Sequence, residues 1–262
     1  HLVCVISLMI SESQISAFDR EGFFLIPNPF SEDAMLQLER RQNEIEPIWE
    51  QTEWPDGTNA MACQFLMAGE SFLELVENPE LIAMAQQLLQ CDDVVVGACG
   101  MGDSLSIVSR SDARQQVYWH SDGGPERKQV SIRIAFDLHD KPNAPLRILP
   151  GSHKQSEEKI AEILRQNERE SGNFIEGESN LFYAMCEQEI ELILSPETAL
   201  VWTPSCWHAT GLKTGFGRRR TMAWNYLPIG SNNRDCVAAE HIFGEKIQKW
   251  SEFRRALWGL GA

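Results

Sequence analysis

The chain has 262 residues, of which 43% are hydrophobic and 23% charged, which is ordinary for a globular protein and excludes a disordered or fibrous chain. Its formal net charge of −15 argues against a nucleic-acid partner, because such binding depends on basic contacts to phosphate. No run of 18 or more apolar residues occurs, so we expect neither a transmembrane helix nor a membrane partner.

The cysteines and the first residues bear on the cellular compartment. The chain has 7 cysteines, an odd number, and no CxxC pair, so we expect reduced thiols and a cytoplasmic protein. The apolar start HLVCVISLMI lacks a basic region and a cleavage site and is a weak signal peptide. Met9 is a candidate native first residue, with residues 1–8 preceding it; a short terminal strand is the alternative reading.

The first ninety residues are typical of helices. Apolar spacing predicts helices over residues 11–22 and 31–49, with the short strand FFLIP between them. WPDGTNA is typical of a loop. Residues 70–90 are again helical in pattern, with a break expected at Asn78-Pro79. These elements predict a helical N-terminal region.

The pattern becomes β-rich near residue 92. Strands are expected at 92–100, 105–110, 130–138, 146–151, 190–195, 198–204 and 218–228, with helices at 154–170 and 237–258. Helices followed by many short strands favour an α+β fold with a double-stranded β-helix (jelly roll, cupin-like) core over about 92–228. We expect flanking N-terminal and C-terminal helices and a single domain over 1–262.

The motif YWHSDGG carries the main candidate for chemistry. His120 and Asp122, two residues apart, lie on the same side of an extended strand, and Gly123 and Gly124 let the chain turn away after them. His208, 88 residues further on, is the third candidate ligand. Two imidazoles and one carboxylate can hold one face of iron(II) and leave the other open. Taken alone, the motif also fits a structural histidine beside a capping aspartate.

Four other candidate ligands occur, and we assign none of them to a metal. Cys206 is expected to be buried, because free cysteine is mostly a core residue. His153 follows the predicted turn Pro150-Gly151, where Ser152 is expected to form a structural hydrogen bond. We place His139 in a solvated loop and His241 in a structural position on the last helix.

Three motifs together resemble a known family. YWHSDGG, PLRILPGSHK and WHATGLKTGFGRRR are similar to the phytanoyl-CoA dioxygenase family of iron(II)/2-oxoglutarate oxygenases, as is the start ISAFDREGFFLIPNPFSEDAM. Ectoine hydroxylases of the same family are also similar. The likeness runs from about residue 11 to residue 228. One departure is KPNAPLR, where the family often has Asn-Gly before Pro-Leu.

The resemblance implies roles for individual residues. His120, Asp122 and His208 fall on the iron ligands, and Arg219, eleven positions after His208, falls on the arginine that binds 2-oxoglutarate. Arg fits a carboxylate through its planar fork. In strand alternation Arg219 shares a face with Thr221 and Ala223, whereas Arg218 and Arg220 face the other side; a one-residue difference in the loop would shift this assignment. Thr210 is a further candidate contact to 2-oxoglutarate.

The implied function is an iron(II)- and 2-oxoglutarate-dependent dioxygenase that hydroxylates an unactivated C–H bond of a small molecule with O2, releasing succinate and CO2. The carboxylate of Asp122 favours hydroxylation or another oxygenase outcome, such as desaturation or ring formation, over the reaction of related halogenases, which lack it. Two alternatives stay open: a non-catalytic jelly-roll binding protein and a metal cupin enzyme that needs no 2-oxoglutarate.

Loops around 50–70, 100–115 and 154–185 are expected to shape the substrate pocket, and the oligomeric state stays open. Candidate lining residues are Trp49, Trp54, Phe65 and Arg110, for each of which ordinary packing or a surface position is the alternative, and Arg110 and Arg114 are candidates to pair with an acidic substrate.

Overall fold

The computed structural model describes residues 10–103, 118–171, 185–211, 213–231 and 235–261. The predicted residues Arg110 and Arg114, the expected strand at 105–110 and residues 1–9 lie outside these ranges. The elements before residue 90 are α1 (Glu12–Glu21), β1 (Phe23–Pro27), α2 (Glu32–Glu50), α3 (Ala60–Met67), α4 (Glu70–Val76) and α5 (Pro79–Leu89).

The strands dominate from residue 94 to residue 228. The elements of this part are β2 (Val94–Asp103), β3 (Val130–Ala135), β4 (Leu146–Ile148), η1 (Ser152–Lys154), α7 (Glu157–Glu170), β5 (Ile190–Leu192), β6 (Thr198–Trp202), β7 (His208–Thr210) and β8 (Arg220–Pro228). The C-terminal elements are α8 (Cys236–Phe243), η2 (Gly244–Lys249) and α9 (Glu252–Leu257).

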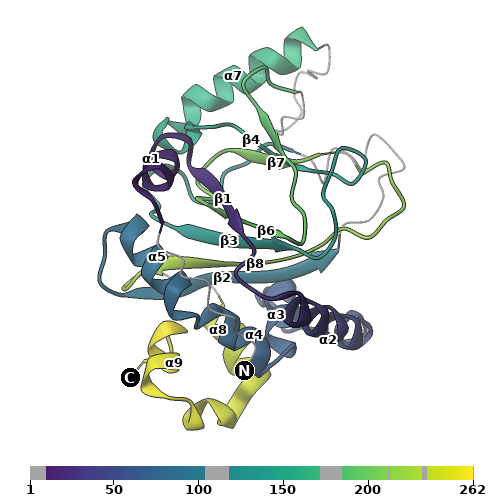
Figure 1. Cartoon of the computed structure of the whole chain (residues 1–262), viewed down its shortest axis with the longest axis vertical. Coiled ribbons are helices and arrows are strands. Elements are labelled where there is room, and N and C mark those ends of the chain that lie inside the picture. The colour runs from purple at the N-terminus through teal and green to yellow at the C-terminus, as the bar shows by residue number, and fades with distance from the viewer. Residues whose placement is uncertain (1–9, 104–117, 172–184, 212, 232–234, 262) are drawn as a thin grey trace.

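Two antiparallel sheets form the core of the fold. The larger sheet has the order β1-β6-β3-β8-β2, and the smaller has the order β5-β4-β7. Figure 1 shows the two sheets facing each other, with α2–α5 and α8 below the larger sheet and α7 above the smaller one. This arrangement is the expected jelly roll, with flanking helices from both ends of the chain.

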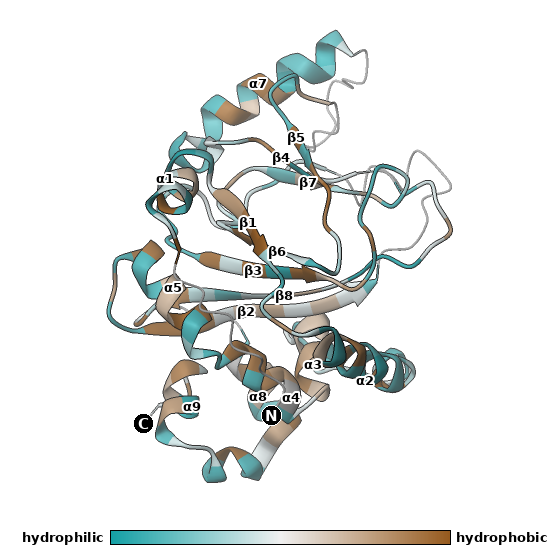
Figure 2. Ribbon diagram, in the orientation of Figure 1, coloured by the Kyte–Doolittle hydropathy of each residue, from teal (hydrophilic) through white to brown (hydrophobic). Residues whose placement is uncertain are grey.

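Side-chain alternation gives the larger sheet two different faces. On β3, Ile132 and Ile134 pack with Trp224 of β8 in the main hydrophobic core, on the side that the helices cover. Ala135 and Trp202 point to the opposite side and join a smaller cluster that includes residues of β4 and β5. Figure 2 shows hydrophobic segments of β3 separated by paler and hydrophilic ones, which matches the different roles of the two faces.

The sequence located most elements, with two differences. Helix α3 was expected to be part of a loop, and five consecutive residues of it, from Ala62 to Leu66, are buried. A helix buried on every side has no amphipathic period for the sequence to reveal. The single helix expected over 237–258 is interrupted, because α8 ends at Gly244, whose φ of 50° is left-handed. The expected break between α4 and α5 is confirmed.

The helices leave no candidate for a membrane span: among the described residues, none is both long and apolar enough to cross a bilayer.

Candidate metal centre

Direct backbone pairing brings two of the three predicted ligands together. His120 and His208 form an isolated antiparallel bridge, in which each backbone N–H donates to the carbonyl oxygen of the other, at 3.0 and 2.9 Å. The segment at His120 therefore extends the smaller sheet beyond β7. Directly paired residues of an antiparallel ladder point to the same face, so both imidazoles lie on one side.

Asp122 is fixed by contacts to its own backbone. Its N–H donates to the carbonyl of Pro204 at 2.9 Å, and its carbonyl accepts from the side-chain amide of Gln129 at 2.6 Å. Gly123 and Gly124 follow with φ values of 118° and 69°, which an L side chain rarely adopts. The predicted sharp turn after the motif is confirmed.

The ligand atoms converge on one point. The Asp122 carboxylate lies 3.9 Å from Nε2 of His120 and 3.9 Å from Nε2 of His208. All three candidate ligand atoms lie within 4.8 Å of one another. Such a group can contact a single ion through bonds of about 2 Å after small side-chain shifts.

Hydrogen bonds to the far ring nitrogens set the tautomer of both histidines. Nδ1 of His120 lies 3.0 Å from the carbonyl of Tyr118, and Nδ1 of His208 lies 2.8 Å from the carbonyl of Cys206. A carbonyl only accepts, so each Nδ1 carries the proton and each Nε2 offers a lone pair. This is the state that a metal-binding histidine requires.

The surroundings of His208 favour its neutral imidazole. Burial lowers the pKa of His208 well below its ordinary value, and the neighbouring His120 lowers it further. The side chain of His208 is only 8% exposed, whereas that of Asp122 is 56% exposed. The site therefore has a closed side at His208 and an open side at Asp122, and its donor set fits a divalent metal ion with free coordination positions.

Arg219 reaches across the interior of the jelly roll. It is buried, and its Nε donates to the carbonyl of Ala144, just before β4, at 2.6 Å. The next carbonyl, that of Pro145, accepts from Gly211, which follows Thr210. Arg219 and Thr210 therefore approach the same edge of the smaller sheet. Burial lowers the pKa of Arg219 to about 9, and nearby Arg133 contributes to the decrease.

The other two arginines of the RRR motif point away from the interior. Arg218 forms ion pairs with Glu46 of α2 and with Asp103 of β2, each at 2.7 Å. Arg220 pairs with Glu39 of α2 and with Asp137 in the same way. Both arginines thus fix α2 against the sheet, and the predicted alternation of the three side chains is observed.

Thr210 lies on the same face of β7 as His208, two residues away, and is paired with Leu146. Cys206 is buried, as expected, with its Sγ 3.2 Å from Nδ1 of His153. Ser152 makes the expected structural hydrogen bond, accepting from the N–H of Trp207 at 2.8 Å. The described contacts of His153 and His241 involve none of His120, Asp122 and His208: His241 packs against Trp54, at 6.0 Å between ring centroids.

One expectation about another histidine is wrong. His139 is fully buried, because its backbone pairs with Leu194, and burial lowers its pKa to about 3. Phe65 serves ordinary packing in the main core, where its ring contacts Phe72 at 5.3 Å. The indole of Trp49 donates to the carbonyl of Ala60 and so serves packing.

The sequence analysis missed Arg133 on β3. The side chain shares the inner face of the larger sheet with Ala135, and its guanidinium lies over the ring of Trp202, 5.8 Å from the centroid. The same indole contacts His208, at 4.8 Å between centroids. A single charged residue within the apolar strand VSIRIAF was the available signal.

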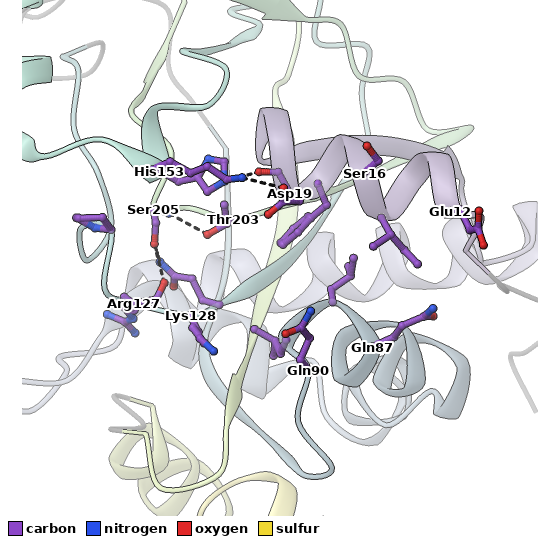
Figure 3. Close-up of a pocket in the computed structure, with 17 residues that line it drawn as sticks. Glu12, Ser16, Asp19, Gln87, Gln90, Arg127, Lys128, His153, Thr203 and Ser205 are labelled. Atoms are coloured by element: carbon purple, nitrogen blue, oxygen red, sulfur yellow. Dashed lines mark hydrogen bonds and ion pairs between the residues drawn. The ribbon is translucent and has the colours of Figure 1, made fainter.

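A separate pocket of about 560 Å³ lies outside the jelly roll, between α1, α5 and the segment after the metal motif. Figure 3 shows Asp19, Lys128, His153 and Ser205 among its labelled residues. None of the three candidate ligands lines it. It therefore belongs to a different part of the molecule from the metal centre.

Comparison with known proteins places the chain in a family. Residues 18–221 match the phytanoyl-CoA dioxygenase (PhyH) family. An ectoine dioxygenase from Bordetella parapertussis is 27% identical over 177 residues, covering 62% of this chain and 56% of that protein. An ectoine dioxygenase from Streptomyces coelicolor is 26% identical over 160 residues, 55% of this chain and 52% of that protein. The chain thus spans just over half the length of these curated relatives.

Solved structures share the fold. EctD from S. alaskensis with bound Fe is 18% identical, with a TM-score of 0.61 over 89% of this chain and 84% of its own. HygX from Streptomyces hygroscopicus, with nickel and 2-oxoglutarate bound, is 14% identical, with a TM-score of 0.62 over 86% and 89%. The chain therefore belongs to the phytanoyl-CoA dioxygenase family, whose enzymes use iron(II), 2-oxoglutarate and O2.

Proposed function

We propose that this chain, acting as a single catalytic domain over residues 1–262, is an iron(II)- and 2-oxoglutarate-dependent dioxygenase that hydroxylates an unactivated C–H bond of a small metabolite or natural product. His120, Asp122 and His208 hold the metal, and Arg219 binds the distal carboxylate of 2-oxoglutarate, with Thr210 beside it. The convergence of three ligand atoms within 4.8 Å is the observation that carries the proposal.

The bound metal supplies oxidation chemistry with O2, and 2-oxoglutarate leaves as succinate and CO2. The residues of the chain position the reactants. His208, on the closed side, anchors the centre, while the exposed Asp122 leaves the opposite side open for reactants. Arg219 offers a buried, charged fork for a carboxylate, which gives a strong and directional contact in a site of low dielectric constant.

Proteins with this fold catalyse more than one kind of reaction. The solved structures include an epimerase and a carbocyclase, both non-heme and α-ketoglutarate dependent. They are 13% and 12% identical to this chain. Asp122 supports an oxygenase reaction here, and the product of the true substrate decides between hydroxylation and another oxidative outcome. A cytoplasmic setting is part of the proposal, because the buried Cys99 and Cys206 are free thiols.

An anaerobic titration tests the proposal. Iron(II) and then 2-oxoglutarate are added without O2, and chelation by a redox-active metal is expected to give a weak visible charge-transfer band. Arg219→Gln should weaken 2-oxoglutarate binding by about tenfold or more, because it removes a charge-assisted contact. Arg218→Gln is the matched control, since that side chain faces α2.

The outcomes separate the proposed enzyme from its alternatives. Metal binding without any response to 2-oxoglutarate would favour a metal cupin enzyme that needs no keto acid. Absence of metal binding would favour a non-catalytic jelly roll. Equal effects of Arg219→Gln and Arg218→Gln would remove Arg219 from its assigned role. Succinate release in a screen of metabolites then identifies the substrate.

A further inference from the structure

Arg133 places a second guanidinium inside the jelly roll. Its backbone pairs with Ala223 of β8 and with Leu200 of β6, in the middle of the larger sheet. Side chains alternate along β3, and the neighbours Ile132 and Ile134 face the helices, so Arg133 faces the smaller sheet. It is therefore on the side of the metal centre.

The position of this guanidinium is fixed from one side. The ring of Trp202 lies beneath it at 5.8 Å and also contacts His208 at 4.8 Å, so one indole connects Arg133 to a candidate metal ligand. A cation over an indole face is attracted by the ring quadrupole. The contact orients the guanidinium but leaves its N–H groups free to donate.

These N–H groups have no acceptor among the described residues. Nε of Arg133 is buried without a hydrogen-bond partner, and so is Nε1 of Trp202. No hydrogen bond or ion pair described for the chain involves the terminal amino groups of Arg133, a residue of intermediate burial. Buried donors in native proteins are normally satisfied, so an unsatisfied set points to a bound acceptor.

Among the described residues, Asp122 is the carboxylate whose charge acts on Arg133, and in the loaded site this carboxylate holds the metal. Iron(II) and the ionised carboxylate of Asp122 sum to +1, and 2-oxoglutarate and the guanidinium of Arg219 sum to −1, by formal charges of these groups. The two sums cancel, and the guanidinium of Arg133 remains in excess on this inner face. Asp103 does not offset it, because its carboxylate pairs with Arg218. A partly buried cation is costly unless an anion accompanies it.

We propose that Arg133 is the recognition residue for an oxyanion of the primary substrate, so that the substrate is a carboxylate or another small organic anion. The inference rests on the proposed function and adds the chemical class of the substrate. The anion contacts the terminal amino groups of Arg133, while Trp202 holds the guanidinium in place. Arg133 thus acts in addition to Arg219, which binds the keto acid.

The first experiment tests binding without turnover. The protein is loaded with iron(II) and 2-oxoglutarate in the absence of O2, and sodium sulfate is added as a probe oxyanion, with sodium chloride at equal ionic strength as reference. Sulfate should raise the melting temperature of the wild type in two ways, by saturable binding to the folded state and by the general stabilising effect of this salt. Arg133→Gln should lose the saturable part of the rise, whereas Lys128→Gln, in the separate outer pocket, should keep it. An equal rise in wild type and Arg133→Gln would overturn the proposal.

The second experiment distinguishes the source of the oxyanion. The affinity for 2-oxoglutarate is measured in Arg133→Gln and Arg219→Gln by the anaerobic titration. We expect it to be unchanged in the first and about tenfold or more weaker in the second. Comparable losses in both variants would assign Arg133 to the keto acid and overturn the substrate class.

The third experiment addresses the substrate directly. Succinate release is measured with small acids and with their primary carboxamides as matched pairs. Acids should stimulate release and amides should not, and the stimulation should be lost in Arg133→Gln. Stimulation by amides equal to that by acids would contradict the proposal. If the wild type binds no 2-oxoglutarate, the proposed function fails instead, and the sulfate titration of the metal-free protein still decides whether Arg133 binds an oxyanion.

Discussion

The side chains on the two faces of the larger sheet have different roles. On the outer face Ile132, Ile134 and Trp224 are fully buried against helices. On the inner face of the same strand, Arg133 has a buried donor without an acceptor. Two adjacent residues of one strand thus serve stability and recognition separately. A binding site can keep polar groups without hydrogen-bond partners when the residues on the opposite face of the same sheet provide the packing that stabilises the fold.

The largest effect on this comparison is expected from the outer face. Trp224→Ala should lower the free energy of unfolding by about 3–5 kcal/mol, because it leaves a cavity in the main core. Chemical denaturation measures the loss, and Phe216→Ala, at a side chain that is 98% exposed, is the control with no expected change. A loss below that of ordinary surface variants would show that the outer face does not carry the stability.

The next largest effect is expected at the metal site, which lies beside the smaller sheet. Asp122→Ala should weaken metal binding by about a hundredfold or more, since loss of even an outer-shell partner of a metal ligand costs about 10–100-fold. Stability should change little, because the side chain is 56% exposed. Glu126→Ala removes an exposed carboxylate four residues away and is the control in a metal titration. Wild-type affinity in Asp122→Ala would exclude Asp122 as a ligand.

A smaller effect is expected from the support of that ligand. Gln129 is buried and donates to the carbonyl of Asp122, and its side-chain oxygen accepts from Asn225 at 3.1 Å. Gln129→Leu should weaken metal binding by about tenfold, at the lower end of outer-shell effects. The metal titration used for Asp122 checks this. An unchanged affinity would mean that the turn holds Asp122 without Gln129.

The smallest effect is a pH dependence from His139. Burial lowers its pKa to about 3 in the folded protein, so below its ordinary value of 6.5 the unfolded chain binds more protons. Stability is therefore complete above pH 6.5 and is lost as the pH falls toward 3. Between pH 6 and pH 5 the loss should be about 1 kcal/mol, and His139→Gln should show a shallower slope in denaturation curves. Identical slopes would contradict the assignment.

Local patterns predicted the parts of the site that depend on short-range geometry. The two-residue spacing put His120 and Asp122 on one side, and alternation separated Arg219 from its two neighbours. Both follow from the period of a strand, and both are seen in the structure. The three-dimensional meeting of the segments at residues 120 and 208 required the resemblance to a family, since no local rule sets a pairing across 88 residues.

Long-range pairing also explains what the sequence could not reveal. His139 stands in the polar stretch DLHDK, which resembles a solvated loop, yet pairing with Leu194 buries it. Arg133 interrupts a strand that is otherwise apolar, and its significance depends on the register that places it beside Trp202. Register between distant strands is set by the whole fold and has no signature in one segment.

The reciprocal backbone hydrogen bonds between His120 and His208 imply that a bound ion would also stabilise the fold. The ion would join the side chains of the same two residues whose main chains already hold an outer rung of the smaller sheet. It would then act as a clasp that closes a loop of 88 residues, and such a clasp restricts the unfolded chain more than the folded one. Loss of the metal would thus lower the stability of the folded protein as well as abolish its activity.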